Sequence, residues 1–461
     1  MGGKAAILLV LGFSMIFLIF GHNFSSLSTR AIDNMTSYYE ETQAFNIANA
    51  GANMAANQIF MDRTWDDGYT NISFGGGTIN VYITNNVGGT TGKVVICHIP
   101  PGNPDAQHTM NISGSALAAH LAHGDYVGPC GGGATYNDQI ATIISEGTYQ
   151  NVTKTIIVEL QPSNFAKFGN YYSTISAYPA TGDVFNGPFH TNGRLTTYGT
   201  PVFNGKVTTR NGLRKLGSPP NPQFLGGYED GVDIPLEFDT TGLRSKSDLT
   251  FRGTSSPNRG IDVRLYFSDD GSLTYSSKAE GAGSWSAEQT ISLGSLTNGV
   301  IYVEKGNIYT KGTVNGAVTI VATKKGRNGF GNVYQEDNLQ YHDDPLIEED
   351  SDDMLGIVAE ENIRIDDNVN TRGKDITTQA SMFAMNGNIG PEDGLVTQHF
   401  LGDWNILGGL IASTTRVTAT YSGSNPVRGL RFVHTYDERF LVNVPPAFPH
   451  TRNFEVVSWY E

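Results

Sequence analysis

The hydrophobic pattern of the N-terminal sixty residues predicts one long helix. An almost uncharged apolar run, AAILLVLGFSMIFLIF, extends from Ala5 to Phe20 and is preceded by one charge at Lys4. The run is short for a membrane-spanning helix, which needs about 20 apolar residues. No proline occurs before Pro100, and apolar residues keep helical spacing at Phe45, Ala48, Ala52, Ala55 and Ile59. A helix over residues 4–59 would be roughly 80 Å long.

Such a helix has two interpretations. In the first it is a membrane anchor that carries a stalk. In the second it is an assembly helix, which lies in the bilayer before assembly and packs against copies of itself afterwards. Small residues at Ala48, Gly51, Ala52 and Ala56 allow another backbone to approach closely. We therefore expect arginine at Gly51 or Ala52 to block assembly and to leave the β region folded.

The apolar run and the segment FNIANAGANMAANQIF resemble the N-terminal helix of the type IV pilin superfamily, particularly of the large PilX-type pilin-like proteins. The resemblance implies a precursor in the inner membrane, a pilus assembly machinery as partner, and helices that form a filament core. The family's usual glutamate at the fifth mature position is Ala5 when counted from Met1. The residues expected to form the assembly helix are Ala5, Leu8, Leu9, Leu11, Phe13, Ile16, Phe17, Phe20, Ala48, Gly51, Ala52 and Ala56.

Beyond Trp65 the pattern becomes that of a β protein, so the expected fold class is α+β, a long N-terminal helix followed by a mostly β region. FGGGTINVYITNN and ATIISEGTYQNVTKTIIVELQ are typical of strands. From about Asn164, short apolar pairs alternate with Gly, Asn and Thr turns, which predicts a solenoid or β-helix. A β-sandwich is the alternative. Strands are expected near Val202, Val207, Ile301, Ile308, Val314, Val318, Ile357, Ile363 and Ile411, and a hairpin around Asp270 and Gly271.

The later part of the chain also resembles the C-terminal region of large bacterial pilin-like proteins, on GPFHTNGRL, TPVFNGKV, NGVIYVE, LGIVAEENI and the closing YDERFLVNVPPAFPHTRNFEVVSWYE. This resemblance implies an architecture and no activity. We expect an assembly helix, a β-rich region, a first solenoid part, a hairpin-rich excursion and a second solenoid part, over residues 1–62, 63–163, 164–225, 226–296 and 297–461.

An insert over residues 93–130 carries both cysteines, Cys97 and Cys130. In an oxidising compartment they would close a disulfide worth about 3–4 kcal/mol. A short helix, SALAAHLAH, would place His120 and His123 on one face, and together with His98 they could bind zinc or copper. His108 or Asp125 could be a further ligand. The alternatives are thus a disulfide with structural histidines, a metal site that the thiols could join, or a catalytic site. The insert resembles a small module of exported bacterial proteins, on ICHIPPGNP and AHLAHGD, which implies no activity.

Composition narrows the remaining chemistry. A net charge of −15 argues against nucleic acid, whose phosphates require clusters of Lys and Arg. The acidic segment 343–353 is interpreted as a solvated loop, with a calcium site as the alternative. His190 could act as a base, but a histidine held by the backbone of a turn fits the pattern better. No HExxH or GxSxG motif occurs.

Three functional classes compete at this point. The first is a structural, non-enzymatic subunit of an extracellular type IV pilus-like filament, a homopolymer that is membrane-inserted before assembly. The second is a minor tip pilin or a membrane-anchored surface adhesin. The third is a β-helical enzyme that acts on polysaccharides, and it is the weakest because acidic or basic residues do not align along one face of the repeats. Fold alone does not decide among the three classes.

Overall fold

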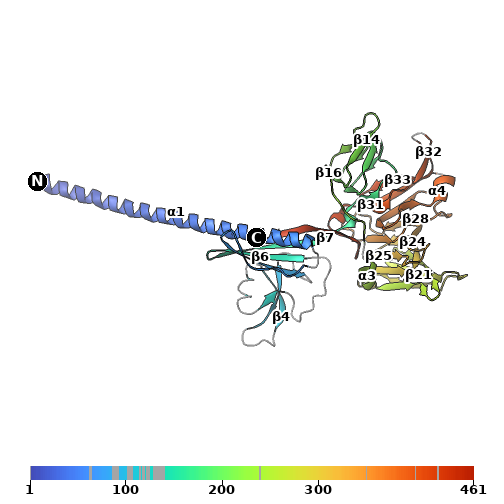
Figure 1. Cartoon of the computed structure of the whole chain (residues 1–461), viewed down its shortest axis with the longest axis horizontal. Coiled ribbons are helices and arrows are strands. Elements are labelled where there is room, and N and C mark those ends of the chain that lie inside the picture. The colour runs from blue at the N-terminus through green and yellow to red at the C-terminus, as the bar shows by residue number, and fades with distance from the viewer. Residues whose placement is uncertain are drawn as a thin grey trace. The chain divides into compact units, whose positions relative to one another are not determined.

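The chain has an α+β architecture, with one long N-terminal helix followed by a mostly β region (Figure 1). Its α-carbon contacts divide it into two compact units, Met1–Pro162 with Asn453–Glu461, and Ser163–Arg452. The last nine residues therefore belong to the first unit, whereas the sequence-based division kept 297–461 together. The computed structural model describes residues 2–61, 65–85, 93–100, 107–113, 116, 120, 125–127, 141–237, 240–348, 350–399, 401–422 and 425–460.

The predicted long helix is confirmed as α1, which extends over Gly2–Met61 without interruption. Its 60 residues correspond to about 90 Å at 1.5 Å per residue. No proline interrupts the backbone hydrogen bonds of this segment. The helix therefore continues well beyond the apolar run with which it begins.

The first unit places the second half of α1 on a five-stranded sheet of order β1-β2-β6-β7-β34. Neighbouring strands from β1 to β7 are antiparallel. The insert contributes a separate small sheet of order β4-β3-β5. The strands of this unit are β1 (Tyr69–Phe74), β2 (Gly77–Asn85), β3 (Lys93–His98), β4 (His108–Ser113), β5 (Tyr126–Val127), β6 (Ala141–Tyr149), β7 (Val152–Asn164) and β34 (His450–Tyr460).

Both faces of strand β6 are covered, which explains why six consecutive residues are buried. Successive side chains of a strand point to opposite faces of the sheet. Ile143 belongs to the core that contains α1, whereas Ile144 packs with Ile96 and Ile112 of the insert. The sheet is thus sandwiched between the helix and the insert.

The small residues of α1 face this sheet, and the expectation that they serve the approach of a sister helix is wrong for three of them. Ala48 and Ala52 are fully buried in the core shared with the sheet, and Gly51 is buried too. Ser145 of β6 donates a hydrogen bond to the carbonyl oxygen of Ala48 at 2.7 Å. The approaching backbone is β6 of the same chain, so arginine at Gly51 or Ala52 would disrupt the first unit itself.

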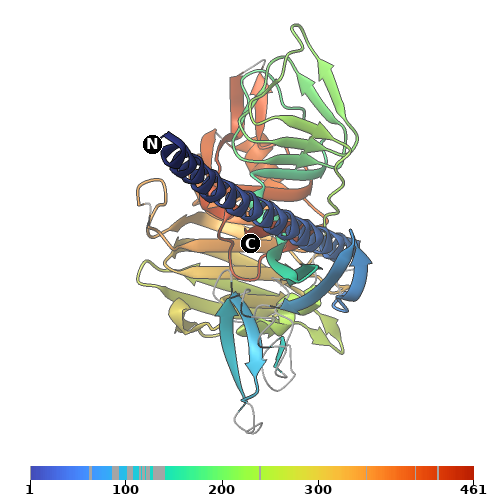
Figure 2. The ribbon, with the colours of Figure 1, turned by 90° about the vertical axis from the view of Figure 1, so that its left-hand side faces the viewer.

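The second unit is built mainly from parallel strands that stack side by side (Figure 2). In its first part, β8, β10, β13 and β16 form one parallel set, β9, β12 and β15 a second, and β11 and β14 a third. The strands of this part are β8 (Asn170–Thr174), β9 (Val184–Phe185), β10 (Phe189–Thr191), β11 (Leu195–Tyr198), β12 (Val202–Phe203), β13 (Val207–Thr209), β14 (Leu213–Leu216), β15 (Gln223–Phe224) and β16 (Tyr228–Asp230).

Parallel pairing continues through the rest of this unit, together with several antiparallel hairpins. Its elements are α3 (Thr240–Ser245), β17 (Leu249–Arg252), β18 (Thr254–Ser255), β19 (Asn258–Arg259), β20 (Ile261–Phe267), β21 (Ser272–Ala279), β22 (Gln289–Ser292), β23 (Val300–Glu304), β24 (Gly306–Val314), β25 (Ala317–Thr323), β26 (Val333–Tyr341), β27 (Met354–Ala359), β28 (Ile363–Ile365), β29 (Ile376–Ala384), β30 (Ile389–Pro391), α4 (Asp393–Gln398), β31 (Gly402–Thr414), β32 (Ala419–Ser422) and β33 (Asn425–Thr435).

Register places apolar residues above one another in this stack. Ile301 of β23 pairs with Ile320 of β25, which pairs with Ile357 of β27, and all three lie in the largest core. Such parallel stacking is the arrangement expected of a solenoid, whereas the sandwich alternative consists of antiparallel sheets. Each predicted strand position lies in a strand.

The expected hairpin around Gly271 is confirmed, because β20 and β21 pair antiparallel across that turn. Gly271 has a φ of 76°, a left-handed conformation that glycine adopts without strain. However, β17 and β20 also pair in parallel with β23 and β24. The segment 226–296 is therefore integrated into the stack and is not a separate excursion.

Candidate functional site

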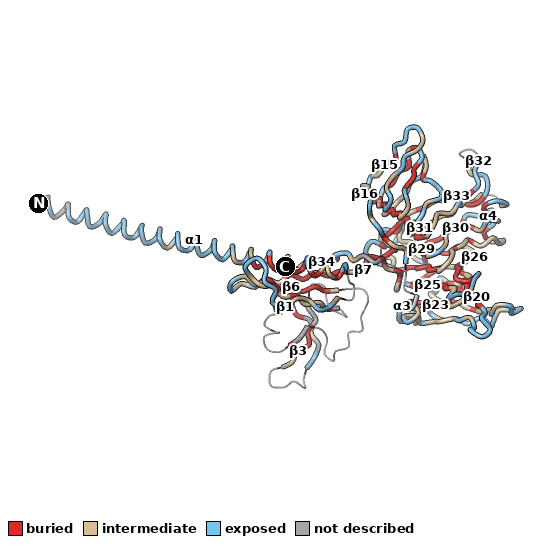
Figure 3. Tube along the Cα trace, viewed as in Figure 1, coloured by how far each residue is buried: buried red, intermediate tan, exposed pale blue. Residues whose placement is uncertain are grey.

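The first half of α1 presents an exposed apolar surface within the described part of the first unit (Figure 3). The large apolar side chains along this surface are exposed, with exposed fractions from 49% at Ile16 to 75% at Met35. Monomeric soluble proteins rarely expose contiguous apolar patches of this extent. The surface therefore marks a place that a membrane or another chain covers.

The uncharged stretch of the helix is longer than the apolar run alone. No Asp, Glu, Lys or Arg occurs between Lys4 and Arg30. At 1.5 Å per residue this stretch measures about 37 Å, which exceeds the roughly 30 Å hydrocarbon core of a bilayer. By length and composition α1 can cross a membrane, and its most apolar part has a mean hydropathy of 2.1 with none of it buried.

The helix meets the sheet near Tyr39. The ring of Tyr39 lies edge-on to that of Tyr149, with centroids 6.0 Å apart. Two residues further along the helix, Glu41 forms an ion pair with Lys154 of β7, with Oε2 of Glu41 3.0 Å from Nζ of Lys154. From Ala44 onward the helix side that faces the sheet is buried. These contacts separate an exposed half of the helix from a docked half.

The residues predicted for assembly therefore fall into two groups. Ala48, Gly51 and Ala52 are docked on the sheet, and Ala56 is half-buried beside the same core. The side chain of Ala5 lies outside the described residues. The exposed group consists of Leu8, Leu9, Leu11, Phe13, Ile16, Phe17 and Phe20.

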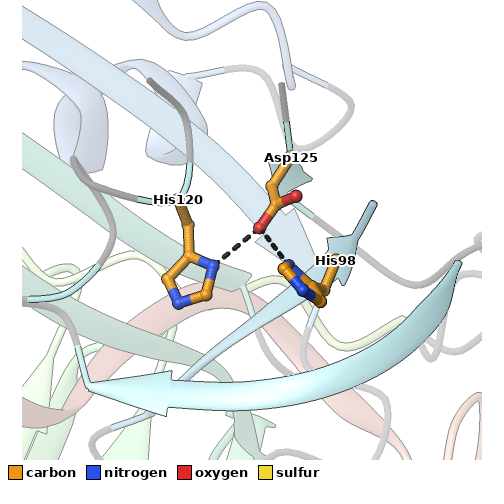
Figure 4. A group of neighbouring side chains, drawn as sticks. All are labelled: His98, His120 and Asp125. Carbon is orange, nitrogen blue, oxygen red and sulfur yellow. Dashed lines mark hydrogen bonds and ion pairs between the residues drawn. The ribbon is translucent and has the colours of Figure 1, made fainter. Parts of the chain in front are cut away.

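A second candidate site lies in the insert, where His98, His120 and Asp125 come together (Figure 4). Oδ2 of Asp125 is 2.8 Å from Nδ1 of His98 and 2.6 Å from Nδ1 of His120. The other carboxylate oxygen accepts the backbone N–H of Ile99 at 2.7 Å. The Asp125 side chain is fully buried, whereas about a fifth of each imidazole is exposed.

Three separate segments supply this cluster. His98 ends β3, His120 is helical, and Asp125 directly precedes β5. The ring of His108, which faces His98 across β3 and β4, lies edge-on to it at 5.4 Å. The structure thus brings together two of the three predicted histidines, and it gives the central position to Asp125, which was only an alternative ligand.

The remaining predicted residues of the insert are Cys97, Cys130 and His123. Cys97 is fully buried and is disulfide-bonded. Cys130 and His123 lie outside the described residues. The pairing of Cys97 with Cys130 and the role of His123 therefore stay predictions.

Two described carboxylates of the acidic segment 343–353, those of Asp344 and Asp353, accept backbone hydrogen bonds. Asp353 accepts the backbone N–H of Gly316 at 2.5 Å and that of Asp343 at 2.8 Å. Asp344 accepts the N–H of Leu346 at 2.9 Å. Calcium at this segment stays a prediction, and these contacts show that Asp353 joins the loop to Gly316 as well as to Asp343.

His190 is a buried structural histidine of β10, but its partners are side chains and not the backbone of a turn. Its Nε2 donates to Oδ1 of Asn192 at 2.9 Å, and its Nδ1 accepts from the hydroxyl of Thr208 at 2.7 Å. The assignment follows because the same Asn192 oxygen also accepts the N–H of Ile234. Burial lowers the pKa of His190 to about 4, so the ring stays neutral at physiological pH.

Comparison with known proteins gives a likeness to solved structures only. No family model matches the chain, and no curated protein sequence matches it. Among solved structures, the chain is similar to the competence-associated pilin ComZ from Thermus thermophilus, with a TM-score of 0.34 and 15% sequence identity. The match covers 91% of this chain and 97% of that chain.

Proposed function

We propose that this chain is a structural subunit of an extracellular type IV pilus-like filament and has no enzymatic role. The observation that carries the proposal is the exposed apolar half of α1, which continues directly into a half that is docked on the chain's own sheet. The resemblance of the N-terminal sequence to the type IV pilin superfamily supports the same function.

Covering the exposed half of α1 removes its apolar side chains from water. Removing a large apolar side chain from water is worth about 1.5–3 kcal/mol, and α1 carries many such side chains between Ile7 and Tyr39. Before assembly, the uncharged stretch can lie in the inner membrane. After assembly, the same surfaces can pack on sister helices. This second step gains little hydrophobic energy, because lipid is already apolar, so close packing must drive it.

The first test is the composition of surface fibres. We expect electron microscopy of sheared surface material to show fibres, and mass spectrometry to identify this chain as their main component. If the chain is only a trace component of fibres made of another protein, it is a minor or tip pilin instead. If it stays entirely in the membrane fraction, it is an anchored surface protein such as an adhesin.

The second test is a charge placed on the exposed half. Leu11→Arg should prevent membrane insertion and fibre formation, because arginine at the centre of a membrane helix costs about 3 kcal/mol or more relative to leucine. Leu346→Arg is the matched control, since Leu346 is an equally exposed leucine of the second unit. Both variants should keep folded β units. Normal fibres from the Leu11→Arg chain would contradict the proposal.

A further inference from the structure

We propose that His98, His120 and Asp125 bind one divalent transition-metal ion, with zinc as the reference ion. Two imidazole nitrogens and one carboxylate oxygen converge on one point, and all three ligand atoms lie within 4.8 Å of one another. Mixed nitrogen and oxygen ligands of this kind suit zinc and copper. This assignment is independent of filament assembly.

The geometry needs only a small adjustment to accept the ion. Zinc is bound at about 2.0–2.2 Å by imidazole nitrogen and carboxylate oxygen, so neighbouring ligand atoms around it lie roughly 3.3 Å apart. Oδ2 of Asp125 is now 2.8 Å and 2.6 Å from the two Nδ1 atoms. Each imidazole would therefore move outward by about 0.5–0.7 Å, and the ion would replace the protons that these hydrogen bonds now hold.

The surroundings also fit a metal site. The backbone N–H of Ile99 binds Oδ1 of Asp125 and fixes the orientation of the carboxylate, as outer-shell donors do in metal sites. The partly exposed imidazoles of His98 and His120 give the ion a route of entry. These three described ligands occupy three of the four positions of a tetrahedral zinc site.

A structural reason for such a site follows from the small core of the insert. In its described residues, the buried apolar side chains are those of Ile96, Cys97 and Ile112. Small modules with little core are commonly held by a disulfide or a metal. An ion held by His98, His120 and Asp125 would join the end of β3, the helical residue His120 and the residue that directly precedes β5.

The test measures zinc in the purified full chain in detergent. The protein is stripped with a chelator, kept free of reductant so that the cysteines stay oxidised, loaded with zinc, and analysed for metal after gel filtration. We expect one zinc per chain. Asp125→Asn and His120→Ala should weaken binding by more than about 100-fold, since even outer-shell changes cost about 10–100-fold.

The matched control is His342→Ala. His342 also lies beside a carboxylate, that of Asp343 at 3.7 Å, but belongs to no described group of three ligands. This variant should bind zinc as the wild type does. If Asp125→Asn also keeps wild-type affinity, or if zinc binds only after reduction, the site is assigned wrongly.

A measurement on the wild type alone decides the matter if the variants do not fold. Amide exchange of β3 that requires the site to open should slow by roughly 100-fold when the zinc concentration is about 100 times the dissociation constant. Copper(II) in place of zinc should do the same if the site accepts both ions. If neither ion binds stoichiometrically nor slows exchange, the cluster is a hydrogen-bonded group only and the proposal is overturned.

Discussion

Replacing one glycine of α1 tests where the small residues of the helix face. A Cβ at Gly51 would collide with the hydroxyl oxygen of Ser145 and would lie 2.7 Å from Cγ2 of Ile79. A Cβ at Gly21, in the exposed half of the same helix, would meet nothing within 4 Å. Gly51→Ala and Gly21→Ala are therefore the same chemical change in one helix with opposite consequences.

The magnitude follows from three contributions. Alanine in a helix interior is favoured over glycine by about 1 kcal/mol. At Gly51, overpacking costs about 1–3 kcal/mol. The displaced Ser145 also loses its hydrogen bond to Ala48, which costs about 1 kcal/mol. The net effect of Gly51→Ala is a loss of about 2 kcal/mol in the stability of the first unit, whereas Gly21→Ala leaves the sheet unaffected.

Amide exchange of β6, followed by mass spectrometry on the full chain in detergent, measures this loss. We expect Gly51→Ala to accelerate exchange through unit opening by roughly 30-fold, at 1.4 kcal/mol per factor of ten. Gly21→Ala should give the wild-type rate. Unchanged exchange in the Gly51→Ala chain together with loss of fibres would refute the reasoning, because the glycine would then face a sister helix and not its own sheet.

Three further predictions concern the histidines, the cysteines and the acidic loop. Burial lowers the pKa values of His190 and His434 to about 4, whereas unfolded histidine titrates near 6.5. The free energy of unfolding is therefore full above pH 6.5 and falls as the pH drops toward 4. At pH 5 the loss is about 2 kcal/mol per histidine. Urea unfolding at pH 7 and pH 5 should show this loss, and His190→Gln should remove its share. Non-reducing peptide mapping should give one cross-linked peptide that contains Cys97 and Cys130, and two free thiols would contradict it. Because Asp353 and Asp344 already accept backbone N–H groups, calcium in place of a chelator should leave amide exchange of 343–353 unchanged, and slowed exchange would instead indicate a calcium site.

Local patterns were sufficient to predict the helix and several of the strands. The period of apolar residues identifies α1, and short apolar pairs between turn residues mark strands such as those near Ile301 and Ile357. Which strands pair is a non-local property that such patterns do not carry. The return of the C-terminal residues of β34 to the first sheet is an example, because nothing in its sequence distinguishes it from a strand of the stack.

The partner of the small helical residues shows the same limit. Small side chains indicate that some backbone approaches closely, but they do not indicate which one. A signal was present in β6, where Ser145 and Gly147 lie two residues apart and thus share one face of the strand. A Cβ on Gly147 would lie 2.9 Å from Cα of Ala48, so both partners of this seam must be small.

The cluster of His98, His120 and Asp125 was predicted only in part, again because local patterns do not show which segments meet. His98 precedes a turn and His120 lies in a helix-like run. Both are candidates because of their residue type alone. His123 was added because it would share a helix face with His120, which is a local argument. The position of Asp125 depends on the fold, since the carboxylate reaches both imidazoles only where β3 and β5 pair.

The two halves of α1 differ in side-chain size, and the difference matches what covers each half. Close docking on β6 requires small residues, and Ala44, Ala48 and Gly51 supply them on the side that faces the sheet. The first half carries large side chains, such as Phe13 and Phe17, in all directions. A helix that is apolar all round is covered on every side by lipid or by other helices. The described part of the chain leaves this half exposed, and in the proposed function a bilayer and then sister helices would cover it without any change in the helix itself.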